Sequence, residues 1–126
     1  MYKILLVEDQ YINQKLMKSV LEKSGYEVTG IGDGESALEL LRNNKYDVIL
    51  MDIQMPELNG YEVAARFRDL EKGTGSHTPI LAMTANSLAG DREKSLDSGM
   101  DDYIAKPLNM IDINARIEAL IKSNSK

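Results

Sequence analysis

The 126-residue sequence contains no cysteine, a single histidine and no long apolar run. Without cysteine there is no disulfide and no thiolate metal site, and the single His77 cannot supply a multi-histidine metal site. No apolar stretch approaches the ~20 residues that a membrane-spanning helix requires. Residues 1–3 lead directly into an apolar run and lack the layout of a signal peptide, so we expect a cytoplasmic location.

Positive charge is also scarce, since 15 Lys and Arg face 20 Asp and Glu and the net charge is -5. Phosphate backbones and anionic membranes attract concentrated positive charge, so we expect neither direct nucleic-acid binding nor membrane insertion. Internal repeats and low-complexity segments are absent. A chain of this length suits one domain that buries roughly two-thirds of the unfolded chain's surface. We expect this domain to span residues 1–122, with a polar tail at 123–126.

Apolar runs typical of buried strands alternate with stretches of helical periodicity. The predicted strands are Ile4–Val7, Glu27–Ile31 at an edge, Val48–Met51, Pro79–Met83 and Tyr103–Ala105. The predicted helices are Tyr11–Lys23, one capped by Asp33-Gly34, one that follows Asn59-Gly60, Leu88–Ser98 and Ile111–Lys122. Their predicted apolar stripes are Ile12, Leu16, Met17, Val20 and Leu21; Ala37, Leu38, Leu40 and Leu41; Val63, Ala64, Phe67 and Leu70; and Ile113, Ile117, Leu120 and Ile121.

Five strands that alternate with five helices predict an α/β fold, a single doubly wound parallel sheet with helices on both faces. In such sheets, ligands bind beyond the carboxyl ends of the strands. The residues that follow the strands are therefore candidates for a functional site. Asp52 is the first of these, because a charge at the end of the apolar run Val48–Met51 must lie where the buried strand leaves the core.

Polar side chains follow four of the five predicted strands: Glu8 and Asp9, then Asp52, Thr84 and Lys106. Carboxylates that lie close together repel one another, so cations must compensate them. Oxygen ligands without His or Cys suit Mg²⁺, which prefers one or two carboxylates together with a phosphate. An aspartate can also act as a nucleophile and form an acyl phosphate, which a metal, an ammonium and a hydroxyl would stabilise. The set is complete for phosphorylation of Asp52.

Each of these residues also has a simpler interpretation. Glu8, Asp9 and Asp52 could be solvated strand ends, Thr84 could cap a turn, and Lys106 could be a surface lysine. Because the carboxyl ends of parallel strands share one edge of the sheet, all five would lie together there. That coincidence favours the functional interpretation over five separate structural ones.

The motifs around these positions resemble those of response-regulator receiver domains. The matching segments, in family order, are Val7–Asp9, Met51–Pro56, Asn59-Gly60, Pro79–Ala85 and Gly99–Pro107. The segments Gln10–Gln14, Ile53–Pro56 and Gly90–Lys94 are most similar to the receivers of hybrid sensor kinases. The resemblance implies a flavodoxin-like fold with strand order 2-1-3-4-5. It leaves open whether the chain is a stand-alone receiver or a module of a longer protein.

The resemblance implies that Asp52 is the phospho-acceptor. The implied ligands of Mg²⁺, or of Mn²⁺ in its place, are Glu8, Asp9, Asp52 and the backbone carbonyl of Gln54. The implied phosphoryl-binding residues are Thr84, Ala85 and Lys106, with Thr84 and Tyr103 as the switch and Gln54 and Asn86 tuning dephosphorylation. The Lys106-Pro107 peptide bond is expected to be cis.

The function implied by the resemblance is phosphorelay signalling. A sensor histidine kinase or a histidine phosphotransfer protein would donate the phosphoryl group, and the surface of Leu88–Ser98, Tyr103–Ala105 and Ile111–Lys122 would change for an unknown downstream target. Such a module is no enzyme beyond its own phosphorylation and slow dephosphorylation. His77 lies in a Gly/Ser/Thr loop and is not predicted to relay phosphate.

Tyr103 could also have a purely structural role in core packing. Two other functions suit the same architecture. A Mg²⁺-dependent phosphatase with an aspartyl nucleophile needs a general acid two residues beyond Asp52, where Gln54 cannot transfer protons. A flavin- or nucleotide-binding domain needs a phosphate-binding loop after the first strand, where Glu8 and Asp9 would repel a phosphate.

Overall fold

The computed structural model describes residues 1–55, 57–84, 93, 97–105 and 109–124. Several predictions therefore lie outside the described residues: the roles of Ala85, Asn86 and Lys106, and the cis bond before Pro107. Most of the predicted helix Leu88–Ser98 lies outside them as well.

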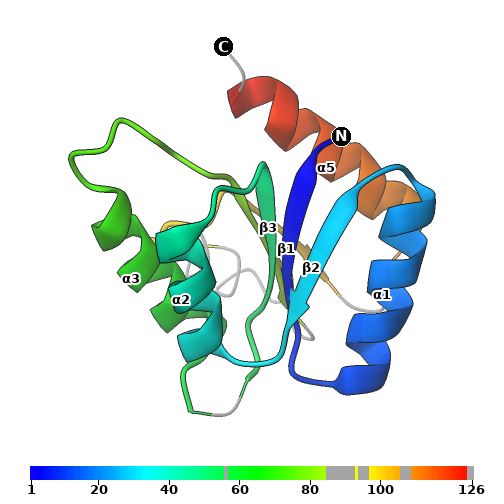
Figure 1. The fold of residues 1–126 in the computed structure, drawn as a ribbon, viewed down its shortest axis with the longest axis horizontal. Helices are drawn as coiled ribbons and strands as arrows, with labels where there is room; N and C mark the ends of the chain where they lie inside the picture. Colours follow the sequence, from blue (N-terminus) through cyan, green and yellow to red (C-terminus); the bar gives the residue numbers. More distant parts are fainter. Residues whose placement is uncertain (56, 85–92, 94–96, 106–108, 125–126) are drawn as a thin grey trace.

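A five-stranded parallel sheet forms the centre of the fold (Figure 1). Its strands are β1 (Lys3–Val7), β2 (Glu27–Ile31), β3 (Val48–Asp52), β4 (Ile80–Thr84) and β5 (Asp102–Ala105). They lie in the order β2-β1-β3-β4-β5, which confirms the predicted order and the position of β2 at an edge. Strand β3 is buried along its whole length, as an uninterrupted apolar run predicts.

Helices cover both faces of this sheet. Figure 1 shows α1 (Tyr11–Lys23) and α5 (Met110–Asn124) on one face, and α2 (Gly34–Asn43) and α3 (Gly60–Glu71) on the other. These are the four helices that have bounds within the described part of the chain. Helix α5 continues through residues 123–124, which the sequence had placed in the polar tail. The doubly wound arrangement follows, because each crossover between parallel strands must place its helix on one face or the other.

Two apolar cores result, one on each face of the sheet. In β1, Leu5 and Val7 pack in the core beneath α2 and α3, while Ile4 and Leu6 pack in the core beneath α1 and α5. Successive side chains of a strand point to opposite faces, so a continuous apolar strand supplies both cores at once. All four of these side chains are fully buried.

Two helix starts lie on the same edge of the sheet as the ends of the strands, and each has its own cap. The side chain of Asp33 accepts the backbone N–H of Ser36 at 2.7 Å at the start of α2. The side chain of Asn59 accepts the N–H of Glu62 at 3.0 Å, and Glu62 accepts the N–H of Asn59 in return. Caps of this kind contribute about 1 kcal/mol each, so short polar sequences determine where α2 and α3 begin.

The predicted inward stripes were wrong at three positions. In α1, Ile12 and Leu16 are 78% and 63% exposed, and Met17 and Leu21 are the buried residues of the helix. In α3, Leu70 is 39% exposed. A helix with apolar residues around more than half of its circumference offers two overlapping stripes, and packing against the sheet selects one of them.

Candidate functional site

Asp52 lies at the carboxyl end of the central strand β3 and is 2% exposed. Its Oδ1 accepts the backbone N–H of Gln54 at 3.1 Å, which orients the carboxylate. Gly60, the first residue of α3, packs directly on this turn: a Cβ atom there would lie 2.7 Å from the carbonyl oxygen of Asp52. The turn after β3 is therefore held both by a hydrogen bond to the carboxylate and by close packing behind it.

Glu8 and Asp9 follow the neighbouring strand β1. Glu8 is 1% exposed and its Oε2 accepts the backbone N–H of Gln10 at 3.2 Å, while Asp9 is the more exposed of the two. One carboxylate oxygen from each of Glu8, Asp9 and Asp52 lies within 4.8 Å of the other two. The predicted convergence of three carboxylates at this edge is confirmed.

The cluster of Glu8, Asp9 and Asp52 concentrates charge of one sign in a largely buried place. Like charges at this separation repel one another unless a cation lies among them. Three carboxylates without imidazole or thiolate form a donor set that fits a hard divalent ion such as Mg²⁺. The residues present therefore fit the metal that the resemblance implies.

Thr84 and Tyr103 come from the next two strands. Thr84 ends β4, is 2% exposed, and follows Met83, which pairs with Asp52 in the register of β3 and β4. Thr84 in turn pairs with Ala105, the last residue of β5. Thr84 thus lies at the same sheet edge as Asp52, as predicted. The half-buried Tyr103 packs against the core beneath α2 and α3, which is the structural role that the sequence left open for it.

Three residues near the carboxylates were not singled out from the sequence for this purpose. Gln10 and Gln14 bond to Glu8, at its carboxylate and at its backbone carbonyl, and Gly60 packs on Asp52. The Asn59-Gly60 pair signalled a helix start but not a close approach. Residue patterns do not reveal these contacts, because they depend on the exact path of the backbone after β1 and β3.

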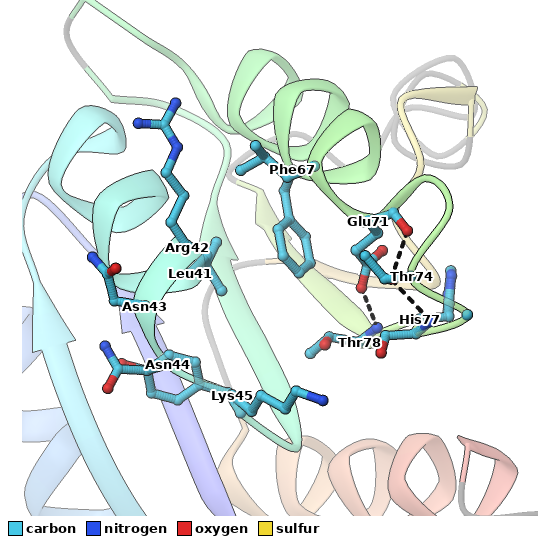
Figure 2. A pocket seen from close by; sticks show the side chains of 14 residues that line it. Leu41, Arg42, Asn43, Asn44, Lys45, Phe67, Glu71, Thr74, His77 and Thr78 are labelled. Carbon is cyan, nitrogen blue, oxygen red and sulfur yellow. Dashed lines mark hydrogen bonds between the residues drawn. The ribbon is translucent and has the colours of Figure 1, made fainter.

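A cavity of about 790 Å³ lies at the opposite edge of the sheet, between the ends of α2 and α3 and the loop before β4. Figure 2 shows its labelled lining residues, among them Phe67, Lys45 and His77. Its acid, Glu71, accepts the N–H of Thr78 at 2.7 Å and an N–H of Arg68 at 2.6 Å. This cavity does not coincide with the carboxylate cluster, and its acid Glu71 is already paired within the protein.

Burial raises the pKa of the Tyr46 phenol, which also lines this cavity, and a hydrogen bond to Thr29 lowers it by less.

Among the described residues, no helix has the length and apolar character to cross a bilayer.

Comparison with known proteins places this geometry in a family. The sequence profile of the response regulator receiver domain matches residues 4–118. Hybrid signal transduction histidine kinases I and B of Dictyostelium discoideum are 47% and 42% identical over 112 and 120 residues, which cover 85% and 88% of this chain. The chain spans only 6% of the length of each kinase.

A solved structure supports the same assignment. The receiver domain of a sensor histidine kinase from Pseudomonas aeruginosa superposes with a TM-score of 0.86 and 40% identity, covering 96% of this chain and 98% of that one. That structure holds a magnesium ion coordinated in its active site cleft. With the profile match, the close relatives and the shared fold, the chain belongs to the response regulator receiver domain family.

Proposed function

We propose that the chain accepts a phosphoryl group on Asp52 from a phosphohistidine of a partner protein, in a Mg²⁺-dependent reaction. The observation that carries the proposal is the cluster of three carboxylates within 4.8 Å, with Asp52 at the end of the central strand. The family match supports it, because it extends over residues 4–118 and so includes every residue of the cluster.

In this reaction a carboxylate oxygen of Asp52 attacks the phosphorus atom of the phosphohistidine. The new P–O bond gives an acyl phosphate as the P–N bond breaks, and the leaving imidazole nitrogen keeps the electron pair and takes up a proton. Gln54 contributes its N–H to Oδ1 of Asp52, which orients the carboxylate that attacks. Because the strand end and the packing of Gly60 hold the backbone of Asp52, little reorientation precedes the reaction.

Glu8, Asp9, Asp52 and the backbone carbonyl of Gln54 would hold Mg²⁺. The ion, when bound, offsets the charge that gathers on the phosphoryl oxygens during transfer. Thr84 would donate its hydroxyl to a phosphoryl oxygen, a role that its buried position at the end of β4 supports. Lys106 and Ala85 would complete the phosphoryl site, and the rim residues Gln54 and Asn86 would set how long the group persists.

The partner would be a sensor histidine kinase or a histidine phosphotransfer protein. Two of the most similar relatives are hybrid histidine kinases, which supports a place in a multistep relay. Phosphorylation would change the surface made by β5, α5 and the predicted helix over Leu88–Ser98, with Thr84 and Tyr103 as the moving side chains. The module would catalyse only its own phosphorylation and its slow dephosphorylation.

The test is incorporation of phosphate from acetyl phosphate, followed by intact-protein mass spectrometry with and without Mg²⁺. Wild-type protein should gain one phosphoryl group only with Mg²⁺, and Asp52→Asn should gain none. The control Asp69→Asn removes an exposed carboxylate of α3 that pairs with Lys72, and it should be labelled like the wild type. Labelling of the wild type without metal, or equal labelling of Asp52→Asn, would rule the proposal out.

A further inference from the structure

Glu8 is held at three separate atoms. Its backbone N–H donates to the carbonyl oxygen of Ile31 at 3.0 Å, and its Oε2 accepts the N–H of Gln10. Its own carbonyl oxygen accepts Nε2 of Gln14 at 3.0 Å. The third bond comes from a side chain of α1 that lies outside the carboxylate cluster and carries no charge. It fixes the direction of the peptide that joins Glu8 to Asp9.

The side chain of Gln14 occupies space that a glycine leaves open. A Cβ atom on Gly30, in strand β2, would lie 2.7 Å from Oε1, 2.9 Å from Cδ and 3.1 Å from Cγ of Gln14. Gly30 is not among the residues with positive φ, so at this position glycine supplies room and not backbone freedom. Glycine inside a strand weakens it, and such a glycine often marks a close approach by another group.

We propose that Gln14 is a positioning residue for the metal ligands, and that Gly30 is required because it seats Gln14. The inference rests on the proposed Mg²⁺-dependent function. Carboxylates that repel one another tend to move apart when no cation is present. The Gln14 bond to the carbonyl of Glu8 resists that movement, because Glu8 and Asp9 both project from the ends of the peptide that it holds. A site that is already in place loses less freedom when it binds the ion.

The experiment measures the affinity for Mg²⁺ by isothermal titration calorimetry on the whole chain. Gln14→Met keeps the length of the side chain and removes the donor, and Gly30→Ala keeps the donor but displaces it. Each variant should bind Mg²⁺ about fivefold more weakly, a modest loss for a group that acts through a ligand's neighbour. The double variant should bind no more weakly than the single ones, because Gly30 acts through Gln14.

Gly32→Ala is the matched control. A Cβ atom at Gly32 would lie 4.0 Å from the carbonyl oxygen of Glu8, which is an ordinary contact, and Gln14 is not among the atoms that it meets. Its Mg²⁺ affinity should equal that of the wild type. A purely structural role for Gln14 would lower the unfolding temperature and leave the affinity of the folded protein unchanged, so unfolding temperatures are measured alongside.

Two results would overturn the inference. Unchanged Mg²⁺ affinity in Gln14→Met would show that the bond does not position the ligands. Fully additive losses of affinity in the double variant would show that Gly30 does not act through Gln14. If Gln14→Met does not fold, Gly30→Ala alone decides the question by the same measurement. Failure of the wild type to bind Mg²⁺ would instead overturn the proposed function on which the inference depends.

Discussion

The two edges of the sheet hold their charges in opposite ways. At the carboxyl edge, Glu8, Asp9 and Asp52 bring charge of one sign together within 4.8 Å. At the amino edge, charges of both signs meet in pairs around one side chain, Arg68. Glu8 and Asp52 are buried, and Arg68 with its partners is largely buried as well, so the two edges differ mainly in the signs of their charges.

Arg68 connects three segments of the amino edge: α3, the loop before β4 and the stretch before β5. Its guanidinium lies 2.6 Å from Glu71 and 2.7 Å from Asp101, and it donates to the carbonyl oxygens of Thr78 and Gly99. Asp101 also accepts the backbone N–H of Ile80 at 2.8 Å. All three guanidinium nitrogens and both carboxylates of this network have partners inside the protein, which is the pattern expected of a structural group.

The two edges suit different roles for a physical reason. In a buried pair of opposite charges, each charge compensates the other within the fold. A cluster of like charges is not compensated in this way, so it can bind a cation from solution. The cavity at the amino edge is lined by an acid, Glu71, that is already paired. The signs of the charges therefore distinguish the candidate site from the structural edge.

The largest expected effect is the loss of Arg68. Arg68→Met should lower the free energy of unfolding by about 3 kcal/mol, because Glu71 and Asp101 then remain buried without their cation. Urea unfolding measures the loss. Arg66→Met is the control, since Arg66 lies on the same helix but is exposed, and it should change stability by less than about 1 kcal/mol. Mg²⁺ affinity should be unaffected in both variants, and a large loss of affinity in Arg68→Met would break the separation of the two edges.

The second effect is stabilisation by the metal. Mg²⁺ at about 100 times its dissociation constant should raise the free energy of unfolding by about 2.7 kcal/mol, because it binds the folded carboxylate cluster and not the unfolded chain. Urea unfolding with and without Mg²⁺ measures the gain. Asp9→Asn should lose most of the gain, and Asp69→Asn should keep it.

The third effect is a gain in stability, whereas most substitutions lower the free energy of unfolding. Without metal, Asp9→Asn should raise the free energy of unfolding by about 1 kcal/mol, because it removes one of three mutually repelling charges. Chemical denaturation in the presence of a chelator measures this. A destabilised variant would mean that the carboxylates of the metal-free protein do not oppose one another.

The smallest effect concerns Tyr46 at the amino edge. Burial raises the pKa of this phenol from its ordinary value of 10.0, so the fold favours the neutral form. The stability that this provides is fully present below pH 10 and is lost as the pH rises through the folded-state pKa. Above pH 10 the free energy of unfolding should therefore fall less steeply with pH in Tyr46→Phe than in the wild type. Tyr11→Phe, at an exposed position, should show the slope of the wild type. Equal slopes for both variants would contradict the prediction.

Much of the carboxylate site could be predicted because its residues adjoin strands that are recognisable by themselves. Asp52 ends a run of four apolar residues, and Glu8 and Asp9 end another, so parallel pairing brings them to one edge. The caps Asp33 and Asn59 were predictable for a similar reason, since capping depends on side chains within one helical turn.

The network around Arg68 could not be predicted in this way. Arg68 and Asp101 are separated by 33 residues, and neither stands in a pattern that indicates the other. The exposure of Ile12 and Leu16 was likewise missed, because helical periodicity offers two stripes and only the neighbouring sheet selects between them.

By itself, the sequence determined the strands, their order of appearance and the acids that end them, because apolar runs and turn residues act over a few neighbours. Only the tertiary structure decided which face of α1 is buried, that Arg68 closes the amino edge, and that Gln14 rests on Gly30 while it holds Glu8. Each of these contacts joins segments that are distant along the chain or belong to different elements, so it exists only once the sheet has brought them together.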